Sequence, residues 1–209
     1  MKTESRKGLP KLRRLRRSEL PVETVALARF LIGKYLVHES REGRLSGRIV
    51  ETEAYVVGDA AAHSYRGMTP RNRSLFLDRG HAYVYFIYGN WYCFNVSSET
   101  AGVGAGILIR ALEPVEGNEI MKRRRPHAEL HRLASGPGCL ATAFGIDRRL
   151  DGLDLCGKEE LWLGRASGGS SQFDIGNSVR IGITKEAHRK LRFYERGSPS
   201  VSGAAHLKA

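Results

Sequence analysis

The sequence predicts an α+β fold in a single domain, with a mainly antiparallel curved sheet, surrounding helices and a protruding β-hairpin. Segments with strand character outnumber helical ones, and tight turns join them, which favours antiparallel pairing. Two aromatic-rich runs, residues 82–88 and 91–97, are joined by Gly89-Asn90, a dipeptide typical of hairpin turns. The 209 residues are enough to bury one compact core.

The N-terminal quarter contains a charged segment, a helix and two strands. Residues 1–20 carry eight basic and two acidic side chains, and we expect a flexible basic arm there. A helical pattern follows over 21–33, where proline opens the segment and glycine suits the C-cap. Residues 34–38 and 44–55 have strand character on either side of a turn at 42–43.

The middle of the chain contains a long loop, the hairpin, a strand and a helix. Residues 56–81 lack periodicity and contain several glycines and a proline, and loops of this length are usually functional. After the hairpin, a strand is expected at 107–112. A helix is expected to begin at Glu113-Pro114 and to run to the basic residues 122–125, because positive charge suits a helix C-terminus.

The C-terminal third is expected to close the domain. A helix over 133–145 is entered through a Ser-Gly-Pro turn, and 165–177 is polar and glycine-rich, as in a surface loop. Residues 179–184 and 191–195 have the pattern of closing strands. Residues 201–209 are expected to be a tail, so that the domain spans the residues from 21 to 200.

The charge balance narrows the class of partner. Thirty-four lysines and arginines against 22 acids give a net charge of +12 and a pI near 10.0. Such a balance favours a nucleic-acid partner, and acidic membrane surfaces and protein partners remain open on charge alone. Three cysteines without CxxC spacing, no secretory signal and no long apolar segment indicate an intracellular protein without a membrane span, disulfide framework or zinc knuckle.

Two acidic side chains alternate along the strand at 44–55. Glu51, Glu53 and Tyr55 share one face, because alternate residues of a strand point the same way. The acids are either solvated on an exposed face, or one is a general base, or both hold Mg²⁺. Arg110 lies inside an apolar strand, where a buried guanidinium requires an acid, and we predict Glu53 as its partner. A purely structural ion pair is the alternative, and the net pKa shift of Glu53 stays open.

The loop and the hairpin supply further candidates. Arg71, Asn72 and Arg73 are residue types that contact phosphates. His63, just before them, is either structural or part of a site. On the hairpin, Tyr85 could offer a flat wall to an extruded base and Tyr88, beside the turn, could wedge between base steps; a plain core strand is the alternative.

Eight segments together resemble the alkyladenine (3-methyladenine) DNA glycosylase family. They occur in family order over about residues 20–200, and they are GRIVETEAY (47–55), AAHS (61–64), TPRNR (69–73), YVYFIYG (83–89), NVSS (95–98), IRALEPVE (109–116), SGP (135–137) and RFYERGSP (192–199). The resemblance implies a single α+β domain that docks on the minor groove and flips one nucleotide.

The resemblance also implies roles for individual residues. Glu53 would be the general base for water attacking the sugar C1′, and Arg110 and the backbone carbonyl of Ile181 would orient that water. Tyr55, His63 and Tyr85 would surround the flipped base, with a backbone donor at His63. Asn95 would disfavour guanine by clashing with its exocyclic amine, and Tyr88 would fill the gap in the duplex.

The implied enzyme is a monofunctional purine DNA N-glycosylase that leaves an abasic site. We expect no cofactor and no metal, a double-stranded DNA partner containing damaged purines, and a monomer. The compartment would be the cytoplasmic nucleoid of a bacterium or the nucleus of a eukaryote. The segment 56–62 departs from the family pattern and leaves the choice of lesion open. A non-catalytic DNA-binding module and a metal-dependent nuclease using Glu51 and Glu53 remain the competing hypotheses.

Overall fold

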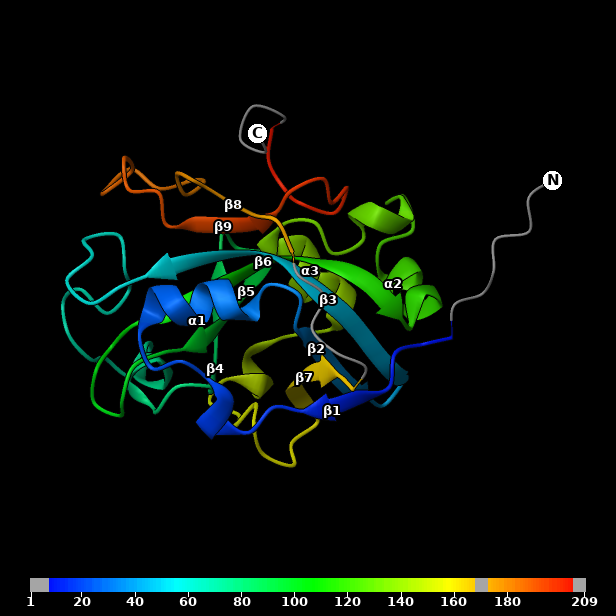
Figure 1. Cartoon of the computed structure of the whole chain (residues 1–209), viewed down its shortest axis with the longest axis horizontal. Helices are drawn as coiled ribbons and strands as arrows, with labels where there is room; N and C mark the ends of the chain where they lie inside the picture. The colour runs from blue at the N-terminus through cyan, green and yellow to red at the C-terminus, as the bar shows by residue number, and fades with distance from the viewer. Residues whose placement is uncertain (1–7, 168–172, 205–209) are drawn as a thin grey trace.

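The computed structural model of the chain describes residues 8–167 and 173–204 (Figure 1). Its strands are β1 (Leu12–Arg14), β2 (Tyr35–Ser40), β3 (Gly43–Tyr55), β4 (Ala82–Ile87), β5 (Trp91–Ser97), β6 (Gly106–Glu116), β7 (Leu161–Ala166), β8 (Ile175–Ser178) and β9 (Arg192–Glu195). Its α-helices are α1 (Thr24–Leu31), α2 (Asn118–Arg124) and α3 (Pro137–Phe144), and short 3-10 turns lie before, between and after them.

The described strands form one antiparallel sheet. Seven of them follow the order β1-β7-β2-β3-β6-β5-β4, while β9 pairs with both β3 and β8. The hairpin of β4 and β5 lies at one end of this order, and β4 is the edge strand. The α+β class with an antiparallel sheet, predicted from the strand-rich pattern and its tight turns, is confirmed.

The long strand β3 is the centre of the sheet. Its first half pairs with β2, its second half pairs with β9 at Glu51, Thr52 and Glu53, and β6 runs along its other edge. The pairing with β6 shifts register on both sides of Glu51: Ala111 is opposite Glu51, and Ile109 is opposite Thr52. Arg110 is therefore the extra residue on β6, and such irregularities re-aim side chains beside active sites.

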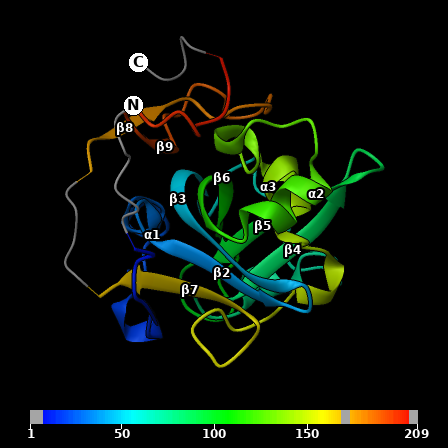
Figure 2. The ribbon, with the colours of Figure 1, turned by 90° about the vertical axis from the view of Figure 1, so that its right-hand side faces the viewer.

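Helix α1 covers one face of β3. The carboxylate of Glu23 accepts hydrogen bonds from the N–H groups of Val25 and Ala26 and so caps the helix. The hydroxyl of Thr52 donates to the carbonyl of Ala28 in α1, 3.0 Å away. Because neighbouring strand residues alternate, Glu51 and Glu53 point to the other face. Figure 2 shows α1 on one side of the central strands and α2 with α3 on the other.

Segments near both ends of the chain contribute to the core, which corrects two expectations. Residues 12–20 are not a flexible arm: β1 pairs with β7, and Leu15 and Leu20 are buried. An arginine-rich segment folds here because its apolar residues reach the core while its charges stay at the surface. In the segment expected to be a tail, Val201 and Ser202 are also buried. Residues 1–7 and 205–209 lie outside the described residues.

Several element boundaries also differ from the prediction. Strand β6 continues to Glu116, with Pro114 opposite Gly47, and α2 begins only after Gly117. The predicted surface loop at 165–177 overlaps β7 at its start and β8 at its end. Residues 168–172 of this loop lie outside the described residues. Residues 179–184 are not a strand. No helix in the described part of the chain is both long and apolar enough to cross a membrane.

Candidate active site

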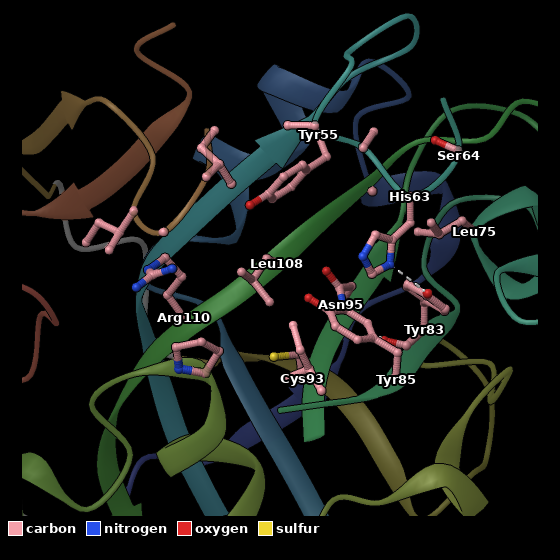
Figure 3. Close-up of a pocket in the computed structure, with 18 of the residues that line it drawn as sticks. Tyr55, His63, Ser64, Leu75, Tyr83, Tyr85, Cys93, Asn95, Leu108 and Arg110 are labelled. Atoms are coloured by element: carbon pink, nitrogen blue, oxygen red, sulfur yellow. Dashed lines mark hydrogen bonds between the residues drawn. The ribbon is translucent and has the colours of Figure 1, made fainter. Parts of the chain in front are cut away.

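A cavity of about 350 Å³ opens between the central strands and two loops. This volume lies in the range of small-molecule sites. Strands β3 to β6 and the loop residues 61–64 and 181–183 supply most of its wall, and Leu75, Tyr88 and Pro137 complete it. Figure 3 shows Tyr55 and Arg110 on one side of the cavity and His63, Tyr83 and Tyr85 on the other.

The aromatic wall is made of uncharged rings. Nδ1 of His63 lies 2.9 Å from the hydroxyl of Tyr83, and the rings of His63 and Tyr85 are 4.5 Å apart, edge to face. Burial, together with the positive charge of Arg71, lowers the pKa of His63. Burial raises the pKa of Tyr83 to about 12 and that of Tyr85 still further. At neutral pH the wall therefore offers flat, neutral surfaces that suit a stacked heterocycle.

Glu53 lies behind the opposite wall and is 0% exposed. Oε1 lies 3.2 Å from Nη1 of Arg110 and accepts a 2.8 Å hydrogen bond from the backbone N–H of Ile181. Oε2 accepts a 2.9 Å hydrogen bond from the hydroxyl of Tyr55. All three of these neighbours line the cavity. Burial raises the pKa of Glu53, although Arg110, Ile181 and Tyr55 act in the opposite direction.

The predicted pairing of Arg110 with Glu53 is confirmed, and Arg110 has a second acidic partner. Nε of Arg110 donates to Oε1 of Glu51 across 3.1 Å. Neither carboxylate is solvated, because Glu51 and Glu53 are both 0% exposed. Their oxygens accept from guanidinium, amide and hydroxyl donors, so a metal ion bound between them would face the cationic Arg110. This donor set does not fit the Mg²⁺ alternative.

The loop containing Ile181 is held by a buried ion pair. Arg180 contacts the carboxylate of Asp59, donates to the carbonyl of Ala54 across 3.0 Å, and lies 4.6 Å from the ring centre of Tyr55. This pair joins two loops that line the cavity and places the N–H of Ile181 on Glu53. The contact seen is therefore made by the N–H of Ile181, and the role expected for its carbonyl stays a prediction.

Asn95 and Cys93 lie next to each other on the cavity wall in Figure 3. The side-chain amide of Asn95 donates to the carbonyl of Tyr83 across 3.2 Å, which fixes its orientation. The side chains of Cys93 and Tyr85 interact, and burial raises the pKa of the Cys93 thiol. No motif in the sequence distinguishes Cys93 from an ordinary buried cysteine.

The turn of the hairpin exposes an aromatic side chain. Tyr88 is 81% exposed and has φ +54°, and Gly89 follows with φ +74°. Two consecutive residues with positive φ are typical of the tight turns that match strand twist, and here they project the tyrosine. Phe86 and Trp91, on the flanking strands, are also partly exposed.

Asn72 corrects one of the predicted phosphate contacts. Its side chain is buried, donates to the carbonyls of His63 and Gly67, and accepts from the N–H of Thr69. A buried amide occupied in this way shapes the loop and does not face solvent. Arg71 and Arg73, on either side of it, are exposed.

Sequence reasoning missed three groups that contact Arg110 or its partners. They are Arg192, Ser202 and, as a second partner of Arg110, Glu51. Arg192 is fully buried, and its Nε donates to Oε1 of Glu51 across 2.7 Å. An arginine between apolar residues in a strand was the signal that identified Arg110, and Leu191-Arg192-Phe193 has the same pattern. Ser202 had no such signal.

A basic chain with an aromatic cavity, a buried glutamate–arginine pair behind it and an exposed tyrosine on a hairpin has the features of an enzyme that acts on an extruded base of a nucleic acid. The comparisons agree with this class. The family model described as Methylpurine-DNA glycosylase (MPG) matches residues 18–199, and the chain belongs to this family. The chain is thus a DNA-repair enzyme of the monofunctional, hydrolytic DNA glycosylase class, and its substrate is DNA.

Relatives match over nearly their whole length. A protein of Mesorhizobium japonicum is 64% identical over 192 residues, which cover 92% of this chain and 91% of the relative. A protein of Paraburkholderia phytofirmans is 52% identical over 193 residues, which cover 92% and 90%. One of Methanocella arvoryzae is 46% identical over 187 residues, which cover 87% and 92%. All three are provisionally named 3-methyladenine DNA glycosylase.

Proposed function

We propose that the cavity takes a damaged purine flipped from duplex DNA and that Glu53 is the general base of the hydrolysis. The observation that carries this proposal is the setting of Glu53, a buried carboxylate in contact with three groups of the cavity wall. Burial raises its pKa toward the range in which a carboxylate is an effective base.

The reaction needs one bond made and one broken at the sugar. A water oxygen attacks C1′, the bond between C1′ and the purine nitrogen breaks with its electrons going to the purine, and the water proton passes to Glu53. A cationic alkylated purine such as 3-methyladenine leaves as a neutral base without protonation. The negative charge of Glu53 also stabilises the oxocarbenium-like sugar of the transition state.

The cavity wall supports recognition of the base. Tyr55 on one side and His63 with Tyr85 on the other would flank a flat purine, while flipping costs least for weakly paired, damaged bases. Asn95 is held on the wall by its bond to Tyr83, where its amide would collide with the exocyclic amine of guanine. We further propose that the protein acts as a monomer on intracellular duplex DNA.

The test is excision by Glu53→Gln compared with Glu129→Gln, whose exposed carboxylate lies elsewhere. Duplexes carrying 3-methyladenine, 7-methylguanine, hypoxanthine or ethenoadenine are incubated with each protein, and free base is measured. We expect Glu53→Gln to bind lesion duplex normally and to lose about 10²- to 10⁴-fold in single-turnover release. Undiminished release would disprove the role of Glu53.

The same assay separates the two competing functions. A non-catalytic binding module would bind duplex and release no base from any lesion. A metal-dependent nuclease would lose its activity in EDTA and would cut the backbone directly. The proposed enzyme releases base in EDTA, and its abasic product breaks only after heat or alkali.

A further inference from the structure

Glu51 is the hub of a buried polar cluster behind the proposed base. Its Oε1 accepts from Nε of Arg110, 3.1 Å away, and from Nε of Arg192, 2.7 Å away. Its Oε2 accepts from the backbone N–H of Ser202, also 2.7 Å away. Glu51 itself is 0% exposed, so these donors replace the water that a carboxylate normally binds.

The cluster ties the C-terminal segment, residues 198–202, to the centre of the sheet. Arg192 on β9 also donates to the carbonyl of Ser202 across 3.0 Å. Val201 packs with Val50 on β3, Ala111 on β6 and Tyr194 on β9. The segment is therefore part of the core beside Arg110, although it lies some 150 residues away from Glu51 in the chain.

The guanidinium of Arg110 is held at more than one corner. Nε faces Glu51, Nη1 faces Glu53 across 3.2 Å, and Nη2 lies 3.4 Å from the hydroxyl of Ser202. A guanidinium is planar, so contacts at separate corners set both its position and its orientation. The contact with Glu51 and Ser202 thus determines where Nη1 points.

We propose that Glu51 and the backbone N–H of Ser202 are positioning groups for catalysis, which fix Arg110 so that Nη1 faces Glu53 and the cavity. This inference rests on the proposed role of Glu53 as the base. Glu51 and Ser202 act through Arg110 and do not touch the DNA. The C-terminal segment is thereby a functional part of the active site.

The electrostatics of the two acids agree with a division of roles. Burial alone would raise the pKa of Glu51, but Arg110, Arg192 and the N–H of Ser202 outweigh it, and the pKa is lowered. In Glu53 burial outweighs its donors, and the pKa is raised. Glu51 therefore stays ionised as an anchor while Glu53 exchanges a proton, a pairing typical of enzyme sites with two carboxylates.

The principal test is Glu51→Gln. Each oxygen of Glu51 faces only donors, so a glutamine must turn its NH₂ group toward one of them. We expect single-turnover release of 3-methyladenine from methylated duplex to fall on the order of 10- to 100-fold, because a small displacement of a positioning group is enough for such a loss. Affinity for lesion duplex should change by less than about two-fold.

Glu195→Gln is the matched control. Glu195 pairs with Arg48, which lies on β3 and is partly buried. Like Glu51→Gln, the control removes a carboxylate partner of an arginine, but this arginine lies away from Arg110. Glu195→Gln should release base at the wild-type rate. Thermal unfolding of both variants shows whether each is folded at the assay temperature. Glu51→Asp keeps the charge and should recover part of the rate of base release that Glu51→Gln loses.

The pH profile provides a readout that a merely structural role would not move. Glu53 is faced by Arg110 from β6, by Tyr55 and Glu51 from β3, and by Cys93 from β5. Among these charges Arg110 lowers the pKa of Glu53 most, and the repulsion from Glu51 is a smaller influence. If Glu51→Gln lets Arg110 drift, the acid-side midpoint should move to higher pH. A midpoint that moves to lower pH with the rate retained would show that Glu51 acts only as a nearby charge, and would overturn the inference.

A second pair of variants tests Ser202 without touching either acid. Ser202→Pro removes the N–H that donates to Glu51, and Ser202→Ala keeps it. We expect a larger loss of rate for proline than for alanine, with DNA affinity retained in both folded proteins. Equal rates would overturn the role of the N–H, as would losses that only follow the unfolded fraction.

If Glu53→Gln is inactive while both Glu51→Gln and Ser202→Pro are fully active, this inference fails and the proposed function stands. If Glu53→Gln is fully active, the proposed function fails first.

Discussion

The hydroxyl of Tyr55 donates a 2.9 Å hydrogen bond to Oε2 of Glu53, two positions earlier on the same strand. Tyr55 lines the cavity, whereas Glu53 is fully buried behind it. The phenol thus connects the wall that would contact the flipped base to the carboxylate that would activate water. Burial together with the charge of Glu53 raises the pKa of Tyr55 and keeps this donor protonated.

Tyr55→Phe should shift the acid side of the pH–rate profile. The hydrogen bond from Tyr55 favours ionised Glu53, so its loss raises the pKa of Glu53 and leaves less of the base ionised at a given pH. We expect the acid-side midpoint for 3-methyladenine release to rise by about one pH unit, as the loss of a hydrogen bond to a charged group implies. Tyr65→Phe, which removes an exposed phenol, serves as the control. A midpoint unchanged in Tyr55→Phe would mean that the bond does not affect Glu53.

Tyr88→Ala should weaken base flipping while largely sparing the phosphate contacts. The side chain is 81% exposed at the hairpin turn, where it could replace the extruded base in the stack. The flipped fraction, measured by 2-aminopurine fluorescence at the target site, should fall on the order of tenfold, since unstacking costs a few kcal/mol per step. Tyr88→Phe keeps the ring and should flip normally. The same fluorescence rise in Tyr88→Ala as in the wild type would argue against the wedge.

Neutralising Arg71 and Arg73 should reduce the salt dependence of DNA binding. Both side chains are exposed on the loop that carries His63. For the double variant Arg71→Gln and Arg73→Gln, the slope of log K against log salt should become shallower by about one for each phosphate that an arginine no longer neutralises. Titrations at several salt concentrations measure this slope, and an unchanged slope would mean that neither arginine binds DNA. Asn72→Ala should instead destabilise the loop, because its amide holds the carbonyls of His63 and Gly67.

Leu15→Ala should destabilise the fold, in contrast to the behaviour of a flexible arm. Leu15 is 0% exposed, directly after β1, and its truncation should cost about 2–5 kcal/mol in the free energy of unfolding. Leu9→Ala, at a 61% exposed position in the same basic segment, should stay within about 0.5 kcal/mol. Urea denaturation of the two variants measures the difference. Similar small losses in both would indicate that the segment is not part of the cooperative core.

Much of the site could be predicted because its signals are local. Period-two alternation put Glu51, Glu53 and Tyr55 on one face, and the Gly-Asn turn placed Tyr88 at the end of a hairpin. An arginine between apolar residues required an acidic partner, and Glu53 is one. Each of these inferences follows from chain geometry or from the cost of burying a charge.

Residue type and composition failed as signals where the path of a loop or the pairing of distant strands decides the structure. Asn72 has a phosphate-binding residue type, but its loop folds back so that the carbonyls of His63 and Gly67 use its amide. The basic segment before Leu20 looked unstructured because its sequence contains few apolar residues, yet β7 offers an edge with which β1 pairs.

The sequence by itself determined the α+β class, the hairpin, the two acids on one strand face and the buried arginine, because each depends on residues close together in the chain. Only the tertiary structure decided that Arg110 serves both acids. That outcome depends on the register shifts beside Glu51, on Arg192 from β9 and on Ser202 from the C-terminal segment. Strand pairing and burial bring together residues distant in the chain, and no local pattern encodes the register at which they meet.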